Sequence, residues 1–259
     1  MDKLTAIIIT KNEEKKISCC LNSLKSVADE IVVVDDLSSD ATVKLCRDLG
    51  AKVIINESNG DFDKQRNLGI ANATCEWILQ MDADEIMPQE TGEKIKFLIN
   101  CPEEYVAFKL KRKNYFLGYF LRYSGAYDYM TKIFKKGSAK YTGSSVHETL
   151  SVDGQIGAID ADIEHYPYDS INQVIERSNF YNQIEANLFV SNAEKITLKE
   201  IRYRLTWRAL RLFWKIYFKK KGYKDGTYGL AWCVLNVMST QIKWLKIWEK
   251  AGREGKLID

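Results

Sequence analysis

The sequence predicts an α/β fold with a doubly wound sheet, and three observations support this class. Apolar runs of strand length recur four times before residue 85. A segment of helical length or helical periodicity separates each run from the next. The run at residues 30–34 does not alternate between apolar and polar side chains, which is typical of a parallel strand covered on both faces. Repeated β-α units of this kind form doubly wound sheets.

Each element of the first half follows from its own pattern. Strands are expected at residues 4–10, 30–34, 51–55 and 76–81. After the first strand, Asn12 is expected to cap a helix whose apolar positions 17, 20, 21 and 24 fall at helical spacing. A second helix is expected to run to about residue 49, and a third from residue 64 to 73.

The pattern changes after Glu90. A helix is expected near residues 91–99, followed by strands around residues 106–110 and 130–135. From about residue 170 onward the sequence has a helical pattern to its end. We therefore predict a mixed sheet with a C-terminal helical extension.

Composition and charge exclude some classes of protein and point to a feature of the surface. The 259 residues are 46% hydrophobic and 28% charged, which excludes disordered and collagen-like proteins. The net charge is only +3, but residues 199–224 hold ten basic side chains and one acid. That segment carries +9, so the rest of the chain carries about −6. This asymmetry predicts a basic docking surface on a mildly acidic protein.

Three further features bear on localisation. The six cysteines include no C-x-x-C pair, which favours a reducing compartment. The N-terminus runs directly into a strand pattern without a charged and then apolar leader, so a cytoplasmic protein is expected. The longest uncharged stretch, residues 226–242, is short and polar for a membrane-spanning helix and is expected to be interfacial or buried.

Carboxylates follow three of the predicted strands at the point where each strand ends. They are Glu13, the pair Asp35 and Asp36, and the group Asp82, Asp84 and Glu85. Ligands of open α/β sheets bind at this edge. The chain lacks both G-x-G-x-x-G after the first strand and a P-loop. A bound diphosphate is therefore expected to need a divalent cation held on carboxylates.

Four segments, in this order and at these intervals, resemble the family 2 glycosyltransferases of GT-A fold. They are A-I-I-I-T-K-N-E-E, I-V-V-V-D-D-L-S-S-D-A-T, K-Q-R-N-L-G-I-A-N-A and W-I-L-Q-M-D-A-D-E. The chain looks closest to the bacterial branch that adds a sugar, typically β-1,4-linked glucose, to the lipopolysaccharide inner core. The resemblance also covers Val146-His147-Glu148, His165 and the segment at residues 222–226.

The resemblance implies a metal-dependent, inverting hexosyltransferase that uses Mg²⁺ or Mn²⁺. The donor is a UDP-sugar, with UDP-glucose as the first choice, and the acceptor is a hydroxyl of a membrane-linked glycan such as lipopolysaccharide core. It further implies that residues 1–115 bind the nucleotide sugar and that residues 116–195 bind the acceptor. Residues 196–259 are then a helical, basic and aromatic extension. A nucleic-acid partner is not expected.

Roles for individual residues follow from the same resemblance. Asp84 and His165 are expected to hold the cation, and Asp82 to reach the sugar or ribose directly or through water. Asp36 is placed to accept the uracil N–H, whereas Asp35 can instead hold the turn. The remaining nucleotide contacts are expected from Thr10, Asn12 and Glu13 on the ribose side and from Lys64, Arg66 and Asn67 beside the base and phosphates.

A base must remove the proton of the attacking hydroxyl. The resemblance places the pair His147 and Glu148 beside the acceptor, so Glu148 is the predicted general base. Glu85, next to the D-x-D pair, is the rival.

The segment after residue 199 is expected to form a helix with one apolar stripe, one aromatic stripe and basic residues between them. Such a helix suits peripheral binding to an anionic membrane, here the inner face of the cytoplasmic membrane. The alternative is a helix packed on both sides with its basic stripe in water. The stripes comprise Ile201, Leu205, Ala209, Leu212 and Ile216; Tyr203, Trp207, Leu210, Trp214 and Tyr217; and Arg204, Arg208, Arg211, Lys215 and Lys219.

Two other functions stay open at this stage. A sugar nucleotidyltransferase also uses a doubly wound sheet and carboxylate-held metal, but it is expected to carry a glycine-rich N-terminal loop, which residues 7–16 lack. A non-catalytic basic module for phosphate or nucleic acid would explain the basic segment alone.

Overall fold

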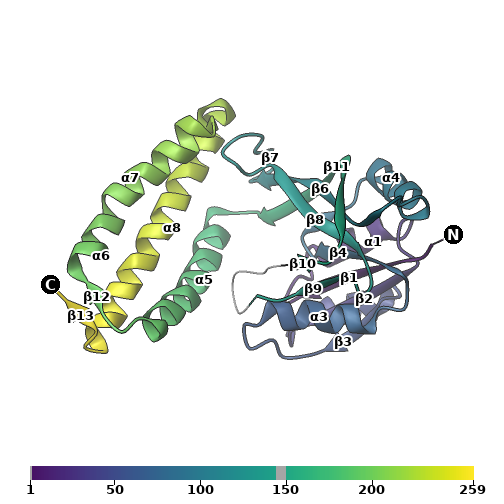
Figure 1. The fold of residues 1–259 in the computed structure, drawn as a ribbon, viewed down its shortest axis with the longest axis horizontal. Coiled ribbons are helices and arrows are strands. Elements are labelled where there is room, and N and C mark those ends of the chain that lie inside the picture. The colour runs from purple at the N-terminus through teal and green to yellow at the C-terminus, as the bar shows by residue number, and fades with distance from the viewer. Residues whose placement is uncertain (1, 144–149) are drawn as a thin grey trace. The chain divides into compact units, whose positions relative to one another are not determined.

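The computed structural model describes residues 2–143 and 150–259 (Figure 1). The chain divides into two compact units: residues 1–113 with 128–166, and residues 114–127 with 167–259. The elements of the first unit are β1 (Leu4–Thr10), α1 (Ile17–Leu24), β2 (Glu30–Asp35), α2 (Thr42–Asp48), β3 (Lys52–Ile55), α3 (Phe62–Asn72), β4 (Trp77–Asp82), β5 (Glu85–Ile86), α4 (Gln89–Asn100), β6 (Tyr105–Phe116), β8 (Asp128–Lys135), β9 (Ala139–Tyr141), β10 (Leu150–Val152) and β11 (Gln155–Tyr168).

The main sheet is mixed, as predicted. Within the described residues its strand order is β3-β2-β1-β4-β8-β6-β11-β5. The first four strands in this order pair in parallel. β8 then pairs antiparallel with both β4 and β6, and β11 pairs antiparallel with β5. The parallel part comes from the four N-terminal β-α repeats, and the antiparallel strands extend it on one side.

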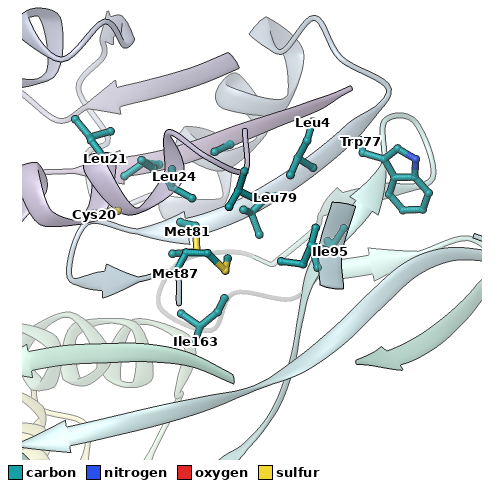
Figure 2. Packing of buried hydrophobic residues seen from close by; sticks show 14 of the residues in the cluster. Leu4, Cys20, Leu21, Leu24, Trp77, Leu79, Met81, Met87, Ile95 and Ile163 are labelled. Atoms are coloured by element: carbon teal, nitrogen blue, oxygen red, sulfur yellow. The ribbon is translucent and has the colours of Figure 1, made fainter. Parts of the chain in front are cut away.

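The core lies on both faces of this sheet. Alternate side chains of β1 point to opposite faces, so Leu4, Ala6 and Ile8 belong to one hydrophobic cluster and Ile7 to another. Figure 2 shows the first cluster, in which Leu21 and Leu24 of α1 lie with residues of β1 and β4. Removing each such side chain from water contributes about 1.5–3 kcal/mol.

The second face is covered by α3, which approaches β1 closely. A Cβ added at Gly69 would lie 3.3 Å from the Cβ of Ile7. The close packing of α3 against β1 therefore explains the glycine in the Q-R-N-L-G segment. The N-terminus of α3 is capped by the Asp61 side chain, which accepts a hydrogen bond from the backbone N–H of Lys64 at 2.9 Å.

The second unit is mainly helical. α6 (Leu198–Leu205) and α7 (Trp207–Trp214) run side by side with α8 (Gly226–Arg253), and α5 (Ile171–Asn192) lies along the opposite side of α8 (Figure 1). Its core is built around Ala186, Val190, Ile201, Trp244 and Ile247. The other elements of this unit are β7 (Tyr119–Phe120), β12 (Ile196–Thr197), a π-helical turn (Lys215–Lys219), a 3₁₀ turn (Gly222–Asp225) and β13 (Leu257–Ile258).

Two local expectations were wrong. The helix expected after residue 199 is not continuous, because it breaks at Thr206 into α6 and α7. The Thr206 hydroxyl donates a hydrogen bond to the Arg202 carbonyl at 2.7 Å, a contact that bends helices. Asn12 does not cap α1, which begins at Ile17. Asn12 instead has a left-handed backbone, with φ +54°, and binds the loop after β2.

Candidate functional site

The strand-end carboxylates meet at one edge of the sheet, as their positions in the sequence predicted. In the register of the sheet, Thr10 lies beside Asp35 on β2, and Ile9 lies beside Asp82 on β4. β1 is the central strand of these three, so the loops after β1, β2 and β4 are neighbours.

Asp82, the last residue of β4, is surrounded by cations. Its Oδ1 lies 2.8 Å from the Arg66 guanidinium, and its Oδ2 lies 3.4 Å from the Lys132 Nζ and 3.7 Å from Arg112. Burial alone would raise the pKa of this carboxyl. The nearby charges of Lys132, Arg66 and Arg112 outweigh that effect and hold the pKa well below its ordinary value. Asp82 is therefore ionised at neutral pH.

Glu85 begins β5 and is completely buried. Its Oε2 accepts a hydrogen bond from the Lys132 Nζ at 2.8 Å and another from the backbone N–H of Asp82 at 2.9 Å. Its Oε1 lies 3.5 Å from Arg112. The carboxylate thus closes the turn between β4 and β5 while it pairs with the buried Lys132 and the partly exposed Arg112.

Asp84 lies within this turn and faces His165, the histidine that was expected to hold the cation together with it. Its Oδ1 is 3.3 Å from the Nε2 of His165, and both side chains are largely buried. The sheet explains the meeting, since His165 on β11 is the register partner of Glu85 on β5. The backbone carbonyl of Asp84 also accepts a hydrogen bond from the N–H of Tyr166 at 2.9 Å.

The two aspartates after β2 have different surroundings. Asp35 is fully buried and accepts hydrogen bonds from the backbone N–H and hydroxyl of Ser38, at 2.9 and 2.6 Å. Asp36 is partly exposed and binds both Ser58 and the Lys11 ammonium, the latter at 3.0 Å. Burial would raise the pKa of Asp36, but the Ser58 and Lys11 contacts hold it below its ordinary value.

The residues after β1 hold the neighbouring loops together. The Asn12 side chain accepts a hydrogen bond from the N–H of Ser39, and the backbone N–H of Glu13 donates to the Thr42 hydroxyl, both at 2.8 Å. Thr10 is buried at the end of the strand, and its hydroxyl has no hydrogen-bond partner among the described residues.

The three residues predicted on α3, which are Lys64, Arg66 and Asn67, have different surroundings. Arg66 is buried, pairs with Asp82 and lies with its guanidinium 5.4 Å from the centre of the Tyr141 ring. The Asn67 side chain exchanges two hydrogen bonds with the backbone of Tyr141, so it fastens α3 to β9. Lys64 is exposed.

Sequence reasoning missed two cations of the site, Lys132 on β8 and Arg112 on β6. The sequence held a signal for Lys132, which alternates with the apolar Met130 and Phe134 in the predicted strand at residues 130–135 and is 1% exposed in the structure. A lysine on the apolar side of a strand needs a counter-charge when it is buried. Arg112 gave no comparable signal, because its strand carries several basic residues.

The predicted base Glu148 and its neighbour His147 lie outside the described residues. Glu148 therefore stays a prediction from the sequence.

Comparison with known proteins settles the family. The family model described as Glycosyl transferase family 2 matches residues 5–149, more than half of the chain. The protein belongs to glycosyltransferase family 2. The predicted resemblance and the α/β fold, with its mixed GT-A type sheet and C-terminal helical extension, are confirmed.

Several relatives of this glycosyltransferase span nearly all of its length. An uncharacterized glycosyltransferase of Rickettsia felis is 28% identical over 100% of this chain and 94% of its own. The lipopolysaccharide core biosynthesis glycosyltransferase LpsC of Rhizobium meliloti is 24% identical over 95% of this chain and 92% of its own. Among solved structures, residues 1–349 of S. aureus TarS align with 98% of this chain and 92% of that chain at 18% identity, with a TM-score of 0.47.

The side chains of Asp84 and His165 fit a divalent cation that is also coordinated by a bound diphosphate. Asp84 and His165 offer one carboxylate and one imidazole within 3.3 Å of each other, which is a donor set suited to Mn²⁺. Among residues 2–143 and 150–259, no group of three or more acidic, histidine or cysteine side chains is arranged to hold a metal. The other ligands would therefore be diphosphate oxygens and water.

Proposed function

We propose that this enzyme is an inverting, metal-dependent glycosyltransferase that moves a sugar from a UDP-sugar to a hydroxyl of a membrane-linked glycan. One observation carries the proposal: Asp84 and His165, 81 positions apart in the sequence, lie together at the sheet edge beside the ionised Asp82. We infer that the first two hold the cation and that Asp82 binds the ribose or sugar.

The other residues of the site have supporting roles in this proposal. Arg66, oriented by its pairing with Asp82, lies beside the phosphates, and Asp36 accepts the uracil N–H. Asp35 holds the turn through Ser38. Thr10, Asn12 and Glu13 line the ribose side, and Lys64 and Asn67 border the nucleotide. A bound Mg²⁺ or Mn²⁺ would supply positive charge to the diphosphate as it leaves.

Glu148 is the proposed base, which takes the proton of the acceptor hydroxyl as that oxygen attacks the anomeric carbon. Glu85 is poorly suited to this step, because it has no exposed surface and both of its oxygens contact cations. Inversion follows from a single displacement, in which the acceptor oxygen bonds to the carbon as the bond to UDP breaks.

The donor prediction can be tested by thermal unfolding with UDP-glucose, UDP-galactose, UDP-N-acetylglucosamine and GDP-mannose, each with and without Mn²⁺. A ligand at one hundred times its Kd stabilises the folded state by about 2.7 kcal/mol. We expect UDP-glucose with Mn²⁺ to raise the melting temperature by several degrees and Mn²⁺ alone to do so much less. Stabilisation that is equal with and without Mn²⁺ would contradict the metal-bridged diphosphate.

The acceptor class is proposed as lipopolysaccharide core. The sequence resemblance points to the inner-core branch, and the full-length similarity to LpsC, named for lipopolysaccharide core biosynthesis, supports it. The linkage and the acceptor sugar would be read by the shape of the acceptor pocket.

A membrane-linked acceptor is consistent with the surface of α7 and α8. The exposed residues Trp207, Leu210 and Trp214 follow one another along α7, each more than 60% exposed, and Leu230 and Val234 are exposed on α8. Arg208, Arg211, Lys215 and Lys219 are exposed around the same helical segment. We propose that this basic and aromatic surface binds the anionic cytoplasmic face of the inner membrane. In the described residues, no helix is both long and apolar enough to cross a membrane.

The membrane prediction is tested by sedimentation with anionic and neutral liposomes. Each basic residue near an anionic surface contributes about 1 kcal/mol. Changing Arg208, Arg211, Lys215 and Lys219 together to Gln should therefore weaken binding to anionic vesicles at least tenfold, and high salt should do the same to the wild type. Equal, weak binding of both proteins to both lipids would show that the basic stripe faces only water.

A further inference from the structure

Lys132 and Glu85 form a buried ion pair directly beneath the turn that carries Asp82 and Asp84. The two side chains are 1% and 0% exposed, and their charged atoms are 2.8 Å apart. Of the described lysines, only Lys132 is buried. Neither group is open to solvent, so direct contact of either with a substrate is not expected.

The contacts of this pair tie the turn to two different parts of the sheet. The same Glu85 oxygen that binds Lys132 also accepts the backbone N–H of Asp82. Lys132 belongs to β8, which pairs with β4, and Glu85 pairs in register with His165 on β11. The pair therefore links the end of β4 to the neighbouring strand β8 and, through β5, to β11.

Stability alone is a weak explanation for such a pair. Well-packed apolar residues often replace a buried ion pair without loss of stability, whereas removal of one partner is strongly destabilising. The pair does supply geometry, because it fixes the backbone between Asp82, the proposed ligand of the sugar or ribose, and Asp84, the proposed ligand of the cation.

We propose that Lys132 is a positioning residue of the transfer reaction. Through Glu85 it holds the turn of Asp82 and Asp84 in the conformation that binds a divalent cation together with the donor diphosphate. This inference rests on the proposed function, since it assumes that Asp84 is a cation ligand, and it assigns Glu85 to positioning instead of proton transfer.

The test compares four proteins: wild type, Lys132→Met/Glu85→Gln, Lys132→Arg and the control Lys135→Met. Lys135 lies on the same strand, but it is partly exposed and is 3.9 Å from Glu76. Mn²⁺ binding is measured by calorimetry in the presence of UDP, together with thermal unfolding and turnover of UDP-glucose. The double variant removes both charges, so it avoids leaving one of them buried and unpaired.

We expect the double variant to fold and to bind Mn²⁺ about 10- to 100-fold more weakly, which is the usual effect of losing a partner that orients a metal ligand. The Mn²⁺ concentration for half-maximal rate should rise by a similar factor. Lys132→Arg should recover part of the affinity, because it keeps the positive charge, and Lys135→Met should stay within about twofold of wild type.

Two results would overturn the inference. One is a folded double variant with wild-type Mn²⁺ affinity. The other is a failure of both Lys132 variants to fold, which would assign the pair to the stability of the fold alone. A wild-type protein that neither binds Mn²⁺ with UDP nor turns over a donor would instead reject the proposed function, so the two failures are distinguishable.

Discussion

Replacement of Asp84 by Asn should abolish sugar transfer while the fold is kept. The amide has nearly the shape of the carboxylate but lacks its charge, so the proposed cation site loses its only carboxylate ligand. Electrostatic groups of this kind contribute two to three orders of magnitude to rate, and we expect a loss of about 10³-fold in kcat/KM. The measurement is release of UDP from UDP-glucose in the presence of acceptor and Mn²⁺.

A control and a second perturbation separate this effect from general damage. Glu90→Gln removes an exposed carboxylate six positions downstream, where it pairs with Lys94 at the surface, and should change the rate by less than about twofold. Circular dichroism and the melting temperature should show that Asp84→Asn is folded. Excess chelator should lower the wild-type rate to that of the variant, and full turnover in chelator would reject the metal requirement.

The fold was predictable where one local pattern decides the structure. β1 covers residues 4–10 as predicted, because a run of strand length that is rich in β-branched residues favours a strand buried on both faces. β11 was not predicted, although Ile159, Ala161 and Ile163 alternate with acids, as in a strand with one buried face. The role of Asn12 depends on a loop 27 residues away, and no local pattern reports such a contact.

The residues of the site that follow strand ends were predictable from the sequence. The cations that contact Asp82 were less so. The topology of parallel β-α units brings the loops after β1, β2 and β4 together, whatever the details of packing. Lys132 and Arg112 reach Asp82 from antiparallel strands added after these units, and their approach depends on the register of those strands. The register is fixed by packing across the sheet, which a single sequence does not display.

Replacement of Glu148 by Gln should stop transfer without loss of donor binding. The amide keeps the size of the side chain but cannot take a proton from the attacking hydroxyl, and general bases contribute about 10²- to 10⁴-fold. We expect less than about 1% of the wild-type rate, with an unchanged stabilisation of the protein by UDP-glucose and Mn²⁺. That combination would separate a defect in chemistry from a defect in binding, because Asp84→Asn should lose both. The double variant Lys132→Met/Glu85→Gln is the informative comparison: it should weaken Mn²⁺ binding, whereas Glu148→Gln should not. If Glu148→Gln keeps more than a tenth of the rate, the base is another residue.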